Sequence, residues 1–181
     1  FIAIAEQLRR AGLSAPEIYH KDEASGLLLI EDFGDDLFAD LMAADPSQEI
    51  PLYRSAVDVL LALRDVPKPE LVTLDAASLV TMLDPVFEWY APDANADKIA
   101  EFITIFQPFA EATTKTETIL MLRDFHVQNL LLLPHRTSVQ QVGILDFQDA
   151  MLAHPAYDLV SILQDARRDV GVDIEREMRD Y

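Results

Sequence analysis

The sequence predicts an α+β fold with two lobes, a small N-terminal lobe and a larger, mostly helical C-terminal lobe. The first residues have helical periodicity, and the two short apolar runs that follow are separated by a polar turn, which is typical of a hairpin. Helical patterns then dominate residues 37–114, and from residue 118 the apolar runs become short and strand-like.

Composition and charge exclude several classes of function. The chain has 181 residues, half of them hydrophobic, and its 14 basic and 32 acidic residues give a net charge of −18. This charge repels nucleic-acid phosphates and anionic lipid headgroups, so we expect no nucleic-acid or membrane partner. Since cysteine is absent, the chain has no disulfide framework and no thiolate ligand or nucleophile.

The predicted N-terminal lobe contains a helix, a hairpin and a connector. Apolar residues repeat at helical spacing over 1–8, and Gly12 supplies a stop signal. Strands are expected at 17–20 and 26–31. The glycine and carboxylates of residues 31–36 suit a connector, which we interpret as the lobe boundary.

The predicted C-terminal lobe is helical at both ends, with strands between. Helices are expected at 37–44, 51–65, 75–91, 95–114 and 157–166, and strands at 118–122, 130–133 and 139–145. Pro85 and Pro108 fall within helical patterns, so we expect each to mark a kink or a boundary rather than continuous helix.

Two carboxylates and an amide are predicted to converge near one end of the last strand pair. If the turn of this hairpin is centred near Arg136, Asn129 lies opposite roughly position 143, which places it within ~10 Å of Asp146. Asp124 lies on the loop just before Asn129.

This set of oxygen atoms suits Mg²⁺, which prefers oxygen ligands and takes few carboxylates from the protein. Asn129 and Asp146 are the natural ligands, and Asp124 is left to orient an attacking hydroxyl or to accept its proton. The alternative is that Asp124 and Asn129 are turn residues that bind local backbone groups.

Three motifs resemble those of one enzyme superfamily. Asp124 with Asn129, followed by Asp146-Phe147, resembles the catalytic and metal-binding loops of the aminoglycoside phosphotransferase and choline kinase superfamily, relatives of the protein kinases. The segment 154–159 is similar to the closing motif of that superfamily. The run from 122 to 170, about 50 residues, most resembles bacterial kinases that phosphorylate N-acetylmuramate and N-acetylglucosamine at the anomeric hydroxyl.

The resemblance implies a protein-kinase-like fold, with residues 1–33 as part of the N-terminal lobe and 34–181 as the helical C-terminal lobe. It implies that Asp124 is the catalytic base and that Asn129 and Asp146 are the magnesium ligands.

It further implies that Glu31, Asp32 and Phe33 form the hinge whose backbone binds the adenine of ATP. His126 is expected to brace the catalytic loop by a hydrogen bond. Arg123 is expected either near the transferred phosphate or in solvent, and Asp158 is expected to anchor the loop backbone.

Two departures from the superfamily pattern are clear. Leu122-Arg123 stands where the superfamily commonly has His-Gly, so the local support of the loop must differ. A glycine-containing phosphate loop and a strand lysine are absent; we expect them before Phe1, and Lys21 is a poor substitute. Glu6 or a missing residue pairs with that lysine, and the C-terminal lobe is also expected to be truncated.

We therefore expect an ATP- and Mg²⁺-dependent kinase of a small amino sugar, located in the cytoplasm. An aminoglycoside or choline-type phosphotransferase and a catalytically silent kinase-like binding module remain open. A hydrolase using Asp124, His126 and Asp146 with a metal is a third possibility.

Residues 22–53 contain nine acidic and no basic side chains, a pattern that favours either a cationic acceptor or a solvated acidic face. Oligomeric state and acceptor-binding residues are not predicted, although Trp89 could contact a sugar ring or belong to the core.

Overall fold

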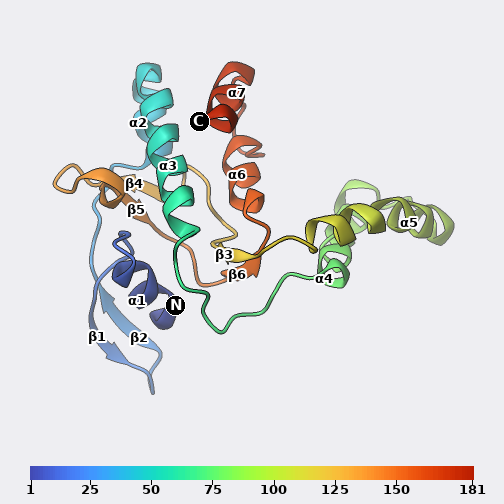
Figure 1. The fold of residues 1–181 in the computed structure, drawn as a ribbon, viewed down its shortest axis with the longest axis horizontal. Coiled ribbons are helices and arrows are strands. Elements are labelled where there is room, and N and C mark those ends of the chain that lie inside the picture. Colours follow the sequence, from blue (N-terminus) through green and yellow to red (C-terminus); the bar gives the residue numbers. More distant parts are fainter.

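The computed structural model describes residues 1–181 and shows a body of helices and short strands with one projecting arm (Figure 1). The helices are α1 (Ile2–Arg10), α2 (Phe38–Ala44), α3 (Glu49–Leu63), α4 (Ala76–Thr81), α5 (Ala96–Thr113), α6 (Ala156–Leu163) and α7 (Val172–Asp180). The strands are β1 (Ile18–Asp22), β2 (Leu27–Ile30), β3 (Ile119–Met121), β4 (Leu130–Leu132), β5 (Val142–Ile144) and β6 (Met151–Ala153). No helix is both long enough and apolar enough to cross a membrane.

Helix α1 confirms the predicted opening helix and its stop. Gly12 has φ +80°, and its N–H donates to Arg9 O while the N–H of Leu13 donates to Leu8 O. These two bonds form a Schellman motif, in which Leu8 and Leu13 are both buried. The chain is thereby turned so that Ser14 pairs with Gly143 on β5.

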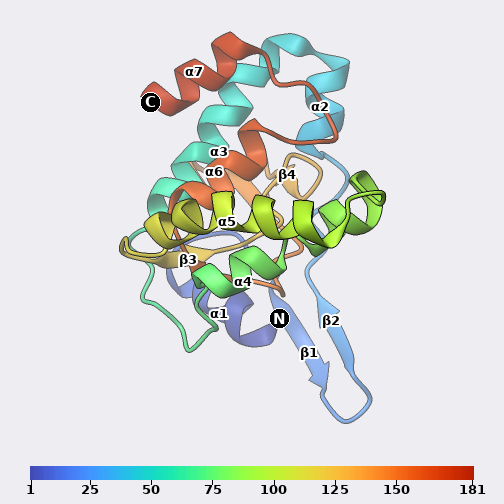
Figure 2. The same ribbon diagram turned by 90° about the vertical axis from the view of Figure 1, so that its right-hand side faces the viewer.

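Strands β1 and β2 form the predicted antiparallel hairpin, which extends away from the body (Figure 2). Strand β1 continues to Asp22, so the turn begins two residues later than the predicted one at Lys21. All four residues of β2 are exposed.

The main core lies between α1, α2, α3, α6 and the short strands. Helix α3 supplies seven buried residues, which confirms the prediction that this helix is buried. Phe147 stacks on Phe1 with ring centroids 4.9 Å apart, so α1 packs directly against the segment that follows Asp146.

Strands β4 and β5 pair as predicted, but the register differs by two residues. Leu130 lies opposite Ile144, and the N–H of Leu145 donates to the carbonyl of Asn129 at 3.0 Å. The predicted partner of Asn129 was position 143. A 3₁₀ turn over Ser138–Gln141 occupies the start of the expected strand and moves the centre of the hairpin. A shift of two residues keeps every side chain on its predicted face, because the side-chain period of a strand is two.

Helices α4 and α5 form the arm (Figures 1 and 2). The helix predicted over 75–91 is interrupted after Thr81 and resumes as a π-helical segment over Val86–Tyr90, next to Pro85. The expectation that Pro108 marks a boundary is wrong, because α5 continues through it. Thr104, whose carbonyl loses its partner at Pro108, is exposed, so water can bind that oxygen.

Helix α6 is joined to the end of β3 by a buried carboxylate. Asp158 accepts hydrogen bonds from the N–H groups of Leu122 at 2.7 Å and Arg123 at 3.0 Å. Strand β6, which was not predicted from the sequence, pairs with β3 and leads into α6. The start of the 122–129 loop is thereby held from two directions.

Gly143 on β5 contacts the side chain of Phe33. A Cβ atom at residue 143 would lie 2.7 Å from Cδ2 of Phe33 and 3.3 Å from Cδ1 of Leu133. The position has no positive φ, so the close approach alone requires glycine.

We expect Gly143→Ala to lower the free energy of unfolding by about 1–3 kcal/mol, because the added methyl group must displace the Phe33 ring. Denaturant unfolding measures the change. Gly171→Ala is the matched control, because its Cβ would meet only Ile174 at 3.8 Å, and we expect a loss below about 1 kcal/mol. A Gly143→Ala protein as stable as the wild type would contradict the packing described.

Burial raises the pKa of Asp158 to about 6, with the N–H groups of Leu122 and Arg123 opposing the rise and the charge of Asp124 adding to it. The stabilising contribution of the protonated group is fully present below about pH 4 and is lost as the pH rises through 6.

As the pH rises from 4 to 7, the unfolding free energy of the wild type should therefore fall by up to about 3 kcal/mol relative to that of Asp158→Asn. Asparagine does not titrate, so the variant removes the contribution of residue 158 from the comparison. A difference that stays constant over this range would show that Asp158 has an ordinary pKa.

Candidate active site

Asp124 lies in the loop between β3 and β4, with its backbone folded tightly around it. The N–H of Asp124 donates to Leu122 O at 3.0 Å, and the Asp124 carbonyl accepts from His126 N at 3.2 Å. Arg123, the preceding residue, has φ 74°. The Asp124 carboxylate is partly exposed and makes no hydrogen bond or ion pair within the chain. It is therefore free to accept a hydrogen bond from a ligand.

Asp146 lies two residues after the end of β5, next to the same loop. The backbone hydrogen bond from Leu145 N to Asn129 O places Asp146, the next residue, near Asn129. Asp146 is exposed, has φ 56°, and accepts a hydrogen bond from Nε2 of Gln148. Left-handed backbone is costly for residues other than glycine, and such conformations cluster at functional sites. The backbone on both sides of the site is thus strained.

The orientation of the Asn129 amide is determined by its neighbours. Its Nδ2 donates to the carbonyl of Asp124 at 2.9 Å and lies 3.2 Å from Nε2 of His126. Because a carbonyl can only accept, this nitrogen is the NH₂ group, and both of its hydrogens are engaged. The amide oxygen remains free. The predicted pair of Asn129 and Asp146 therefore has unoccupied oxygen atoms of the kind that Mg²⁺ accepts as ligands.

No group of three or more His, Asp or Glu side chains is close enough to hold a metal. A magnesium site built on one carboxylate and one amide oxygen needs no such group, because substrate phosphates and water supply the remaining ligands. The donor set present fits Mg²⁺ bound together with a nucleotide and does not fit a three-ligand hydrolase site.

His126 is buried within the loop and neutral. Burial lowers the pKa of His126 and the charge of Arg167 lowers it further, while Asp165, Asp124 and Asp146 oppose the shift. That Asp124 and Asp146 both act on this ring agrees with their predicted convergence. Its Nε2 accepts from Asn129, as a brace would.

Arg123 is partly exposed, and its Nη1 lies 4.0 Å from the carboxylate of Asp149. The structure therefore leaves it near the loop and in contact with solvent, rather than buried in the core.

Residues 31–36, which include the segment expected to act as a hinge, line a cavity of about 440 Å³ together with residues 132–136. Neither the N–H of Asp32 nor that of Phe33 donates to any atom of the chain. Free backbone groups of this kind can bind a planar heterocycle. The Glu31 side chain is instead engaged with Arg136 and, at 3.6 Å, with Arg9.

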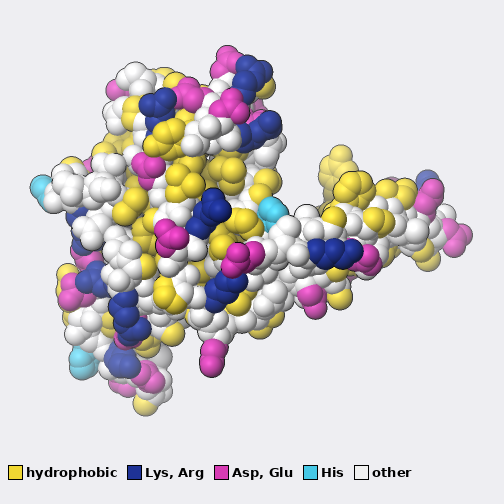
Figure 3. Space-filling model, viewed as in Figure 1, with side chains coloured by type: hydrophobic (Ala, Val, Ile, Leu, Met, Phe, Trp, Pro, Cys, Tyr) yellow, Lys and Arg dark blue, Asp and Glu magenta, His cyan; other side chains and the backbone are white.

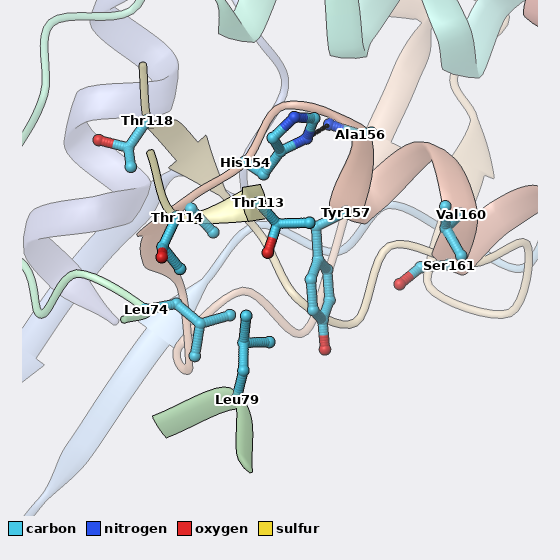
Figure 4. A pocket seen from close by; sticks show the side chains of 11 residues that line it. Leu74, Leu79, Thr113, Thr114, Thr118, His154, Ala156, Tyr157, Val160 and Ser161 are labelled. Carbon is cyan, nitrogen blue, oxygen red and sulfur yellow. Dashed lines mark hydrogen bonds between the residues drawn. The ribbon is translucent and has the colours of Figure 1, made fainter. Parts of the chain in front are cut away.

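A second cavity, of about 400 Å³, lies between the arm and α6 (Figure 4). Tyr157 and Ser161 from α6 form one wall, and Leu74, Leu79, Thr113 and Thr114 lie across from them. The Ser161 hydroxyl donates to the carbonyl of Arg123 at 3.4 Å. Burial raises the pKa of Tyr157. The positive charge of Arg123 opposes this rise, and the negative charges of Asp158 and Asp124 add to it. The cavity thus adjoins the 122–129 loop.

Several residues considered from the sequence are not brought to this site. Lys21 pairs with Glu23 at 2.7 Å, and Glu6 pairs with Arg10 at 2.7 Å, both at exposed positions. Trp89 is 77% exposed on the arm, so the interpretation of this residue as core is wrong. Figure 3 shows apolar side chains gathered along this arm.

Sequence reasoning missed Asp165, Ser161 and Arg136. Asp165 is buried next to the loop, and Arg136 lies over the Phe33 ring at 5.3 Å. Each is a common residue type at a position without a motif, so no sequence pattern signals a role for it.

The acidic stretch of residues 22–53 is partly neutralised by arginines from other elements. Glu31 pairs with Arg136, and Glu49 pairs with Arg168. Figure 3 shows basic and acidic side chains interspersed over the face that it draws. Within the stretch, Glu23 also pairs with Lys21, but the remaining carboxylates form no ion pair, so most of its negative charge is not compensated by a direct partner.

Comparisons with known proteins identify the family of this chain. The model of the phosphotransferase enzyme family matches residues 1–180. N-acetylmuramate/N-acetylglucosamine kinase of Caulobacter vibrioides is 41% identical over 189 residues, covering 97% of this chain and 52% of that protein. The kinase of the same name from Pseudomonas putida is 29% identical over 173 residues, covering 92% and 49%. The chain spans about half the length of these relatives.

Solved structures show the same fold. The ADP-bound aminoglycoside phosphotransferase APH(2'')-Ib superposes with a TM-score of 0.66 at 15% identity, covering 99% of this chain and 64% of that one. A choline/ethanolamine kinase family protein from Mesorhizobium loti gives 0.65 at 14% identity, covering 97% and 57%. The predicted protein-kinase-like α+β fold is confirmed, and the chain belongs to the phosphotransferase enzyme family.

Proposed function

We propose that the protein transfers the γ-phosphate of ATP to a hydroxyl of an amino sugar of the N-acetylmuramate or N-acetylglucosamine class. The proposal rests on the unpaired carboxylate of Asp124, which lies on the same loop as the free amide oxygen of Asn129, and on Asp146, which follows the backbone bond from Leu145 N to Asn129 O. The 41% identity to a kinase named for these two sugars supports the acceptor class.

In this proposal the residues of the chain act mainly by positioning. The Asp124 carboxylate accepts a hydrogen bond from the acceptor hydroxyl and directs its oxygen at the γ-phosphorus. The free N–H groups at Asp32 and Phe33 hold the adenine. Asn129 and Asp146 would hold Mg²⁺, which neutralises charge on the phosphates.

An amino sugar is favoured over a cationic aminoglycoside by the names of the relatives at 41% and 29% identity. Only three of the nine carboxylates in residues 22–53 pair with a cation, so the charge of this stretch does not itself select between the two acceptors. The donor ATP and a small-molecule acceptor suit a cytoplasmic enzyme, and an amino sugar acceptor suits the recycling of cell-wall fragments.

The substrate class can be tested with the full-length protein, ATP and Mg²⁺. We expect N-acetylmuramate or N-acetylglucosamine to yield the sugar 1-phosphate, detected by ³¹P NMR, with choline and aminoglycosides much poorer acceptors. Turnover of an aminoglycoside or of choline alone would support the corresponding alternative enzyme. No ATP turnover with any acceptor would support a silent binding module.

The role of Asp124 can be tested by Asp124→Asn. We expect kcat to fall by about 10²–10⁴-fold, because the amide cannot accept the proton of the hydroxyl. The KM for ATP should change little. Asp149→Asn is the matched control, since this carboxylate is 62% exposed, and should retain nearly full activity. Equal activity of the Asp124 and Asp149 variants would exclude the proposed role.

A further inference from the structure

Two buried polar atoms near the catalytic loop have no hydrogen-bond partner. One is Nδ1 of His126, and the other is Oδ2 of Asp165. The side chain of Asp165 is only 1% exposed, and its other oxygen accepts from Arg167 N at 3.0 Å and Arg167 Nη1 at 3.3 Å. Leaving such groups unpaired is costly, so each requires an explanation.

The tautomer of His126 follows from its neighbour. Asn129 uses one amide hydrogen on the carbonyl of Asp124 and presents the other to Nε2 of His126. The Nε2 atom must therefore accept, and the proton of the neutral ring lies on Nδ1. The unpartnered Nδ1 is thus a donor, whereas the unpartnered oxygen of Asp165 is an acceptor.

The two residues belong to segments that share a cavity. Val127, which follows His126, and Asp165 both line a space of about 250 Å³ between α2 and the turn after α6. This space is large enough for a bridging water molecule. The negative charge of Asp165 also raises the pKa of His126 against the effect of burial, which agrees with their proximity.

We propose that Asp165 is a positioning residue, which accepts the Nδ1 proton of His126 through one bridging water molecule and so fixes the Asn129 amide with its oxygen free. The chain of contacts runs from Asp165 through His126 to Asn129. Its consequence for metal binding rests on the proposed function, whereas the His126 tautomer does not. Groups that orient a ligand residue in this way typically change metal affinity or activity by about 10–100-fold.

Asp165→Asn is the decisive variant, because it keeps the volume and the Asx turn to Arg167 N but replaces the oxygen that accepts from the bridging water by an NH₂ donor. In ¹⁵N NMR of the full-length protein, His126 of the wild type should be the Nδ1–H tautomer, and the variant should shift toward Nε2–H. The Mg²⁺ concentration for half-maximal activity should rise about 10–100-fold, with the KM for the acceptor unchanged.

Asp169→Asn is the control, since it removes a carboxylate from the same cavity at an exposed position and should leave both readouts unchanged. An unchanged His126 tautomer in a folded Asp165→Asn protein would overturn the proposal. An Nε2–H tautomer in the wild type would do so too, even if the variant does not fold. An inactive protein with the expected tautomers would contradict the proposed function and leave Asp165 as the residue that orients His126.

Discussion

The candidate site depends on the buried carboxylate of Asp158, which accepts hydrogen bonds from two successive backbone N–H groups at the end of β3. The loop that follows has no regular structure of its own, so its starting point must be held by side chains. Ser161, one turn along α6, adds a hydrogen bond to the carbonyl of Arg123. Helix α6 therefore fixes the start of the loop that carries Asp124, although the helix contributes no group to the proposed chemistry.

The strained residues of the site lie where these anchors act. Arg123 and Asp146 both have positive φ, and each is next to a strongly held segment: the Asp158 bonds in the first case and the β4–β5 pairing in the second. Phe147, buried against Phe1, adds a third support. Such conformations persist only where the surroundings over-determine them. The site is thus held by the fold.

Much of this arrangement could be predicted from the sequence, because local signals were strong. Gly12 predicted the end of α1, and the spacing of Asn129 and Asp146 across a short hairpin predicted their proximity. The register was wrong by two residues because the turn contains a 3₁₀ segment, which has no apolar signature. Helix α5 continues through Pro108 because this part of the helix is exposed on the arm. The periodicity of the sequence does not predict that exposure. The engagement of Asp165 depends on a turn that folds back onto the loop, which no local pattern encodes.

We propose that Asn129 and Asp146 hold one nucleotide-bound Mg²⁺ beside Asp124. The most direct measurement is paramagnetic broadening by Mn²⁺ in the presence of ADP, followed in the NMR spectrum of the full-length protein. The account predicts that the side-chain amide of Asn129 and the resonances of Asp146 and Asp124 broaden first and together, and that Asp146→Ala removes the effect. Broadening that begins elsewhere in the chain, or that is unchanged in Asp146→Ala, would contradict it.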